Sequence, residues 1–133
     1  MSTVVKIDEF ADALNDALTE YNQEITDGMK LVVDKVSKEV MREIKANITF
    51  DEPTGKYVKA FRIKTVEETK FNLTKAWHVI DHQHGLTHLL EKGHALRGGG
   101  MSRAFPHIVY GDALAKRRME ELAKEVVENV NKP

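Results

Sequence analysis

The feature that most constrains the fold of this chain is an apolar stripe that recurs every three or four residues through its N-terminal third. On a helix this spacing stacks the side chains on one face. The stripe comprises Phe10, Leu14, Ala17, Tyr21, Ile25, Gly28, Val32, Val36, Val40 and Ile44. We therefore predict one long amphipathic helix, with Asp8 as its N-cap. Residues 47–55, which include Pro53-Thr54-Gly55, are expected to end it.

The expected length of this helix raises a packing problem. A continuous helix of about 38 residues would span roughly 57 Å, whereas a compact domain of this size has a radius of gyration of roughly 14 Å. Either the helix breaks near Gly28, which costs about 1 kcal/mol against Ala, or its end projects and contacts another subunit. We favour projection and an oligomer. Gly28 itself is expected to mark either a kink or a close crossing of helices.

The middle of the chain changes to a period of two, which is typical of strands. Residues 57–65 and 71–79 alternate in polarity, and Glu67-Glu68-Thr69-Lys70 supplies a polar turn between them. The two runs predict an antiparallel hairpin over about residues 57–80. A lone hairpin is marginally stable and must pack on a helix or join a larger sheet.

The remaining residues predict a short helix over 86–92 that ends at Gly93, a mobile loop over about 95–104, and an extended piece near 105–110. A final helix is expected from about Asp112, its N-cap, to Asn129. Its apolar stripe is Ala115, Met119, Leu122, Val126 and Val130. The predicted fold class is α+β: a long N-terminal helix and a C-terminal helix packed on a small antiparallel sheet, in one domain of residues 1–133.

Charge and composition narrow the class of protein. The formal net charge is −1, whereas a dedicated nucleic-acid binder usually carries a basic excess. Cysteine is absent, so disulfides and thiolate metal sites are excluded. The first ten residues lack the pattern of a signal peptide, and no apolar run reaches the roughly 20 residues of a membrane helix. We expect a soluble, cytosolic chain.

The histidines suggest a metal site as one hypothesis. Five of the six lie within residues 78–94, and the sixth is His107. On a helix, the spacing of His84, His88 and Glu91 would bring three zinc-type ligands to one face. The His-Glu-x-x-His signature is missing, however, and Gly85 weakens the helical geometry. We expect no metal and no cofactor.

The glycine run invites two further hypotheses. Gly98-Gly99-Gly100 is followed by Met101-Ser102-Arg103, without the lysine and the helix start of a phosphate loop. Ser102 is near His94 and His107 in sequence, but no Gly-x-Ser-x-Gly motif surrounds it. We therefore predict no catalytic residue and no enzymatic activity.

The same loop is basic. Between residues 91 and 107 there are three cations and one acid: Lys92, Arg97, Arg103 and Glu91. A positive, flexible loop can contact DNA or an acidic patch on a partner protein, or it can simply be solvated. We favour an assembly element.

The order of these motifs resembles a family of tailed-bacteriophage neck proteins, the gene-product-ten family of lambdoid siphophages. Thr54-Gly55 matches the Thr-Gly before the family's first strand. Glu91, Gly93 and His94 match its Glu-x-Gly motif, and Pro106 matches the proline ahead of its last helix. The resemblance covers roughly residues 10–130. Many members carry Pro-Ala just before that helix, where this chain has Tyr110-Gly111-Asp112.

The resemblance implies a non-enzymatic minor capsid, head–tail joining or tail-completion protein of a phage or prophage. Its copies would form a homo-oligomeric ring in the virion neck, after assembly in the host cytoplasm. The partners would be the head-closure or connector protein, the tail terminator and the tail tube, with non-specific contact to packaged DNA. The predicted interaction loop contains Glu91, Lys92, Gly93, His94, Arg97, Gly98, Gly99, Gly100, Arg103, Phe105 and Pro106.

Within the loop, Gly93 is expected to adopt a positive φ at the helix end, and Phe105 and Pro106 to anchor the return of the chain. Arg97 and Arg103 are expected to contact a neighbouring protein or DNA. The alternatives are a tail terminator that caps the tail tube and, from other classes, a small metal-dependent enzyme or metal sensor, or a DNA-binding module.

Overall fold

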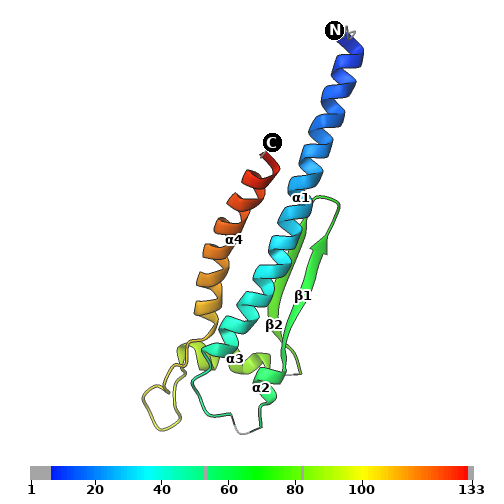
Figure 1. Ribbon diagram of the computed structural model, residues 1–133. Coiled ribbons are helices and arrows are strands. Elements are labelled where there is room, and N and C mark those ends of the chain that lie inside the picture. The colour runs from blue at the N-terminus through cyan, green and yellow to red at the C-terminus, as the bar shows by residue number, and fades with distance from the viewer. Residues whose placement is uncertain (1–6, 53, 82, 132–133) are drawn as a thin grey trace.

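A computed structural model describes residues 7–52, 54–81 and 83–131. Two long helices, α1 (Ile7–Ala46) and α4 (Ile108–Asn131), run antiparallel, and a two-stranded antiparallel sheet packs on α1 (Figure 1). Two short helices, α2 (Lys56–Lys59) and α3 (His84–Lys92), lie at one end of the molecule. This arrangement confirms the predicted α+β class.

Helix α1 runs unbroken for 40 residues, so it does not break at Gly28. Gly28 marks a close crossing instead, because a Cβ there would lie 2.7 Å from Cγ1 of Val126 on α4. At the other end of the pair, a Cβ on Gly111 would lie 2.6 Å from Cγ1 of Ile44. The prediction of an Asp8 cap was wrong, since Asp8 lies within the helix.

The N-terminal part of α1 extends past the rest of the molecule (Figure 1). The turn of the hairpin lies level with Lys30, whose Nζ donates a hydrogen bond to the Thr69 carbonyl at 2.5 Å. Helix α4 crosses at Gly28 and ends at Asn131. We call residues 7–27 of α1 the arm. Its first 14 residues alone span about 21 Å at 1.5 Å per residue.

The sheet pairs β1 (Phe61–Glu68) with β2 (Leu73–Val79) in the register Phe61↔Val79 to Glu68↔Leu73, with a shift between Thr65 and Glu67. The predicted hairpin is therefore present. Glu67 and Glu68, which were expected in its turn, lie in β1, and the turn begins after Glu68. The placement of Tyr57 in the first strand was wrong. Tyr57 lies in α2, where the Glu52 side chain accepts hydrogen bonds from the backbone N–H groups of Tyr57 and Val58.

The predicted extended piece near residues 105–110 was also wrong. Helix α4 begins at Ile108, four residues before the predicted cap at Asp112. The β-branched side chains of Ile108 and Val109 favour a strand when they are considered alone. A tertiary contact from α3, described below, starts the helix here instead.

Two groups of buried side chains form the core. Near α2, the buried residues are Ile44, Tyr57, Ala60, Phe61 and Val79. Between α1 and α4, they are Val32, Val36 and Leu122. Arg118 of α4 also donates a hydrogen bond from Nε to Oε1 of Glu39 on α1, at 3.2 Å. None of the helices in the described residues is long and apolar enough to span a membrane.

Candidate docking surface

Glu91 of α3 joins the short helix to the start of α4. Its Oε1 accepts hydrogen bonds from the backbone N–H groups of His107 at 2.9 Å and Ile108 at 3.0 Å, and its Oε2 accepts one from Val109 at 3.1 Å. The first N–H groups of a helix have no partner within the helix, and the helix dipole favours negative charge beside them. Glu91 is therefore the cap of α4, supplied from another element.

The protonation of Glu91 reflects this role. Burial by itself raises the pKa of this carboxyl group, but the hydrogen bonds from the backbone of Ile108, His107 and Val109, together with nearby His107, lower it by more. The net effect is a pKa below the ordinary value. The carboxylate thus remains charged where it caps the helix.

His107 is fully buried beside this cap, with 0% of its surface exposed. Its Nδ1 lies 2.8 Å from the Phe105 carbonyl and its Nε2 lies 2.8 Å from the Tyr57 hydroxyl, so both ring nitrogens have partners. The Tyr57 hydroxyl also lies 3.3 Å from Oγ1 of Thr87. Burial raises the pKa of Tyr57, which keeps its hydroxyl protonated. These contacts join α2, α3 and α4 rigidly.

Residues 94–102 form a small hairpin on this rigid corner. The Ser102 N–H donates to the His94 carbonyl at 2.7 Å, Ala95 and Met101 form an isolated bridge, and the Leu96 N–H donates to the Gly100 carbonyl at 3.0 Å. The segment predicted as the loop over 95–104 contains this backbone pairing. We call residues 94–102 the tip hairpin.

Gly93 forms the base of the tip hairpin. Its φ is +77°, which confirms the predicted positive φ, and a Cβ here would lie only 2.6 Å from the Ser102 carbonyl oxygen. The Ser102 Oγ accepts a hydrogen bond from the His94 N–H at 2.8 Å and lies 2.9 Å from Nδ1 of the same residue. Both side chains therefore stabilise the base of the hairpin.

The other residues of the predicted interaction loop have distinct positions. Lys92, Arg97 and Arg103 are exposed, as are Gly98, Gly99 and Gly100 in the turn. The guanidinium of Arg103 lies 5.4 Å from the centre of the Phe105 ring. Phe105 is half-buried and its N–H donates to the Leu90 carbonyl at 2.6 Å, whereas Pro106 is exposed. Phe105 thus anchors the returning chain.

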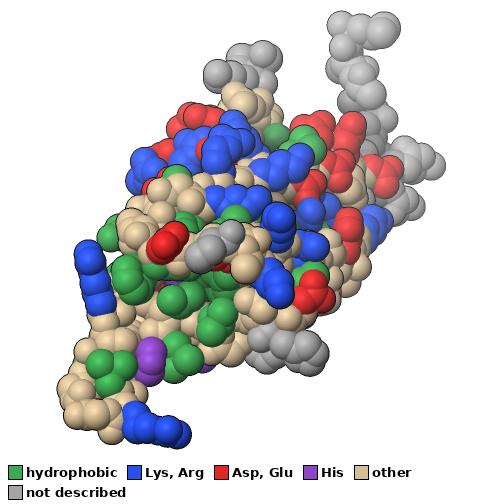
Figure 2. All heavy atoms as spheres, turned by 90° about the horizontal axis from the view of Figure 1, so that it is seen from below, with side chains coloured by type: hydrophobic (Ala, Val, Ile, Leu, Met, Phe, Trp, Pro, Cys, Tyr) green, Lys and Arg blue, Asp and Glu red, His purple; other side chains and the backbone are tan. Residues whose placement is uncertain are grey.

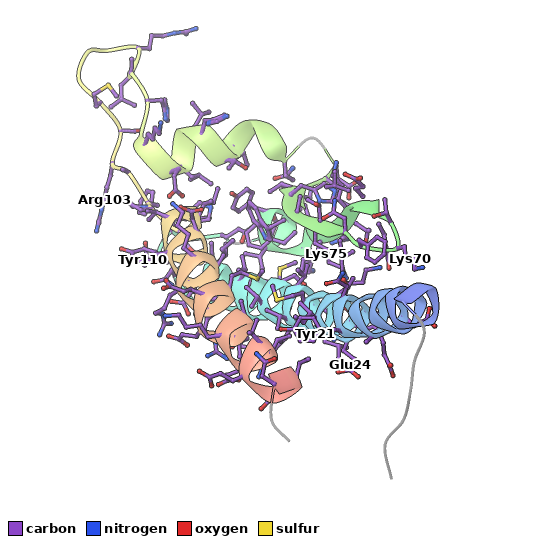
Figure 3. All side chains as sticks on the ribbon, turned by 90° about the horizontal axis from the view of Figure 1, so that it is seen from above. Tyr21, Glu24, Lys70, Lys75, Arg103 and Tyr110 are labelled. Atoms are coloured by element: carbon purple, nitrogen blue, oxygen red, sulfur yellow. The ribbon has the colours of Figure 1, made fainter. Side chains whose placement is uncertain are left out.

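Large exposed apolar side chains gather around the tip hairpin. Of eleven such side chains in the described part of the molecule, six belong to residues 83–111: Leu86, Leu89, Leu96, Met101, Val109 and Tyr110. Figure 2 looks at this end and shows hydrophobic side chains beside the hairpin, with Lys, Arg and acidic side chains around them. In Figure 3, Arg103 and Tyr110 project on the same outer side. We call these six side chains, with Lys92, Arg97 and Arg103, the docking surface.

The arrangement of titratable groups does not support the metal hypothesis for the described side chains. Glu91 contacts the start of α4, and His88 is exposed on α3. The side chain of His84 and residue His82 lie outside the described part. Among the described residues, no group of three His, Cys, Asp or Glu side chains could hold a metal ion. Nor does any described carboxylate hydrogen-bond the His94 ring that contacts Ser102.

A second feature is an apolar cavity of about 430 Å³ between β2 and α4, with α1 as its floor. Its lining includes Val36, Val40, Trp77, Ala115 and Met119. The indole N–H of Trp77 is buried without a hydrogen-bond partner. The cavity could accept an apolar side chain. Two charged residues also line it, Lys75 and Asp112, which pair with Asp34 and Lys116.

Comparisons with known proteins leave the family open. No family model matches the chain, and no curated protein or solved structure matches it.

Sequence reasoning did not find the roles of Tyr57 and His107, because the contact between them joins residues 50 positions apart. It also did not find the exposed apolar side chains of the docking surface. The spacing of Leu86 and Leu89, on one face of a short helix, was the available signal.

Proposed function

We propose that this chain is a non-enzymatic structural protein of a tailed phage or prophage that acts in head–tail joining or tail completion. The observation that carries the proposal is the docking surface, which combines six exposed apolar side chains with three cations. Apolar patches rimmed by polar groups are typical of protein–protein contacts. The motif resemblance to phage neck proteins supports the virion neck as the place of this contact.

The rigid corner beneath the docking surface supports this proposal. Glu91, His107 and Tyr57 hold α2, α3 and α4 in a fixed relation, and the tip hairpin projects from them (Figure 1). A binding surface on a rigid support loses little conformational entropy when its partner docks. The partners proposed are copies of this chain and neighbouring head-closure, terminator and tail-tube proteins.

The test uses a phage genome that carries this gene. Residues 98–100 are deleted and Arg97 is changed to Glu, and the control carries Lys64→Glu and Arg117→Glu, two exposed cations outside the docking surface. The loop variant should fold by circular dichroism, yet filled heads and tails of normal length should accumulate unjoined in electron micrographs. The control should give joined particles.

Two results would change this conclusion. A normal yield of infective particles from the loop variant would overturn the proposed role of the docking surface. Tails of uncontrolled length would favour the alternative role, in which the protein is a terminator that caps the tail tube.

A further inference from the structure

The arm and the docking surface carry opposite charge, which the net charge of −1 conceals. Residues 7–29 contain seven acids and neither Lys nor Arg; the acids are Asp8, Glu9, Asp12, Asp16, Glu20, Glu24 and Asp27. Residues 83–111 contain three cations and a single acid, Glu91. The side chain of Glu91 is only 16% exposed, and its two oxygens accept three backbone hydrogen bonds. Within residues 83–111 the exposed charges are therefore all those of Lys and Arg.

The arm carries its acids on a defined face. Asp16, Glu20 and Glu24 are exposed and follow one another at intervals of four residues, so they lie along one side of the helix. Tyr21, which is 36% exposed, lies next to them. In Figure 3, Tyr21 and Glu24 lie on the side of α1 that faces away from Lys70 and Lys75 of the hairpin. The sheet therefore leaves this face uncovered.

We propose that the arm of one copy binds the docking surface of a second copy of this chain. The inference rests on the proposed assembly role of the docking surface and names its partner. The contact must form between copies, because about 36 Å of continuous helix separates Glu20 from Ile44 at 1.5 Å per residue. With the arm at one end and the docking surface at the other, the contact between copies is a head-to-tail interface. Such an interface closes into a ring or continues as a filament.

The combination of charge and apolar groups favours this occupant over DNA. Phosphates would pair with Arg97 and Arg103 but would leave Leu96 and Met101, the latter 64% exposed, in water. An acidic amphipathic helix satisfies both features, since its apolar side chains cover the apolar patch and its carboxylates face the surrounding cations. Opposite charge also steers the two ends together and disfavours contact between like ends.

The first test uses matched charge reversals in the full-length chain. One variant carries Glu20→Lys and Glu24→Lys on the arm, and another carries Arg97→Glu and Arg103→Glu on the docking surface. The control is Lys64→Glu with Arg117→Glu, which changes the net charge by the same amount as the second variant. By sedimentation velocity at low salt, the wild-type chain and the control should associate. The dissociation constant of each test variant should be at least about tenfold higher than that of the wild type.

Mixing the two test variants gives the sharper result. The reversed arm of the first is complementary to the reversed docking surface of the second, and the two unchanged surfaces are complementary as well. The equimolar mixture should therefore recover association that neither variant shows alone. Raising the salt should weaken association of both the wild type and the mixture, because exposed charges are screened.

A cross-linking experiment locates the contact independently of net charge. The chain has no cysteine, so engineered thiols react only with each other. A Glu24→Cys chain mixed with a Leu96→Cys chain should form a mixed disulfide on mild oxidation. A Lys64→Cys chain in place of Leu96→Cys is the matched control and should give only a background amount.

The inference is overturned if the wild type stays monomeric at about 1 mM and low salt, if the mixed variants do not associate, or if the mixed disulfide does not exceed the control. Its failure is distinct from that of the proposed function. Association through these surfaces in a protein whose loss leaves particles joined would refute the phage role alone. Unjoined particles with a strictly monomeric protein would refute only this inference.

Discussion

Glu91 contacts His107 twice through one oxygen, which accepts the backbone N–H at 2.9 Å and lies 3.1 Å from the ring Nδ1. The same carboxylate also accepts the N–H groups of Ile108 and Val109. Residues 16 to 18 positions apart are thereby fixed to one another. This single side chain starts α4 and positions the base of the docking surface.

Glu91→Gln should destabilise the fold by about 1–3 kcal/mol at neutral pH, because a charge-assisted cap becomes a neutral one. The free energy of unfolding in urea measures this loss. The exposed Glu125→Gln on α4 is the control and should stay within about 0.5 kcal/mol of wild type. Equal stability of the Glu91→Gln variant and the wild-type chain would contradict the capping role.

The effect of Glu91 should also depend on pH. The pKa of Glu91 is lowered in the folded state. Its contribution to the free energy of unfolding is therefore fully present above the unfolded-state pKa of roughly 4.3, and is lost as the pH falls through the folded-state pKa. The stability difference between wild type and Glu91→Gln should be constant from about pH 6 to 8 and shrink below roughly pH 4.3. Urea unfolding at a series of pH values tests this; a difference that grows in acid would refute it.

Tyr57→Phe should cost about 1–3 kcal/mol, because it leaves Nε2 of the fully buried His107 without its hydrogen-bond partner at 2.8 Å. The same change at Tyr110, which is 47% exposed, is the matched control and should be nearly neutral. Thermal and urea unfolding of the two variants provide the comparison. Similar losses at both positions would show that the hydroxyl of Tyr57 has no special role.

Gly93→Ala should destabilise the base of the tip hairpin by about 1–3 kcal/mol. Its Cβ would lie 2.6 Å from the Ser102 carbonyl oxygen, and its φ of +77° is strained for any other residue. Gly98→Ala is the control, since no heavy atom lies within 4 Å of a Cβ there. It should be neutral or slightly stabilising. Equal effects of the two substitutions, measured by urea unfolding, would argue against this geometry.

Gly28→Ala should cost about 1–3 kcal/mol through overpacking at the helix crossing, despite the better helix propensity of Ala. Val126→Ala removes the methyl group that lies 2.7 Å from the new Cβ. In a double-mutant cycle, the two substitutions together should therefore cost less than the sum of each alone. Strict additivity of the unfolding free energies would show that the helices do not meet closely here.

The regular elements could be predicted because their signals are local. The stripe from Phe10 to Ile44 repeats often enough to determine one helix, and the alternation in residues 61–79 determines the hairpin. The start of α4 could not be predicted in this way. Ile108 and Val109 favour a strand by themselves, and the carboxylate that overrides this preference belongs to Glu91, far earlier in the chain.

The features of the candidate site could be predicted from the sequence only where they depend on local residues. The positive φ of Gly93 and the exposed cations Arg97 and Arg103 follow from residue type and sequence position. The exposure of Leu96 and Met101 does not, because an apolar side chain in a loop is expected to fold back on the core. The backbone pairing between residues 94–96 and 100–102 closes the tip hairpin on itself, and both side chains stay exposed.

The crossing of Gly28 with Val126 has a consequence for biosynthesis. The stretch of α1 that is covered by α4 leaves the ribosome before its cover, because α4 follows α1 in the chain with the hairpin and α3 between them. Until Val126 emerges, Val32 and Val36 have no α4 to bury them, although the hairpin can already pack on α1. The nascent chain therefore exposes an apolar stretch of α1 until α4 has been translated, which is the kind of segment that chaperones bind.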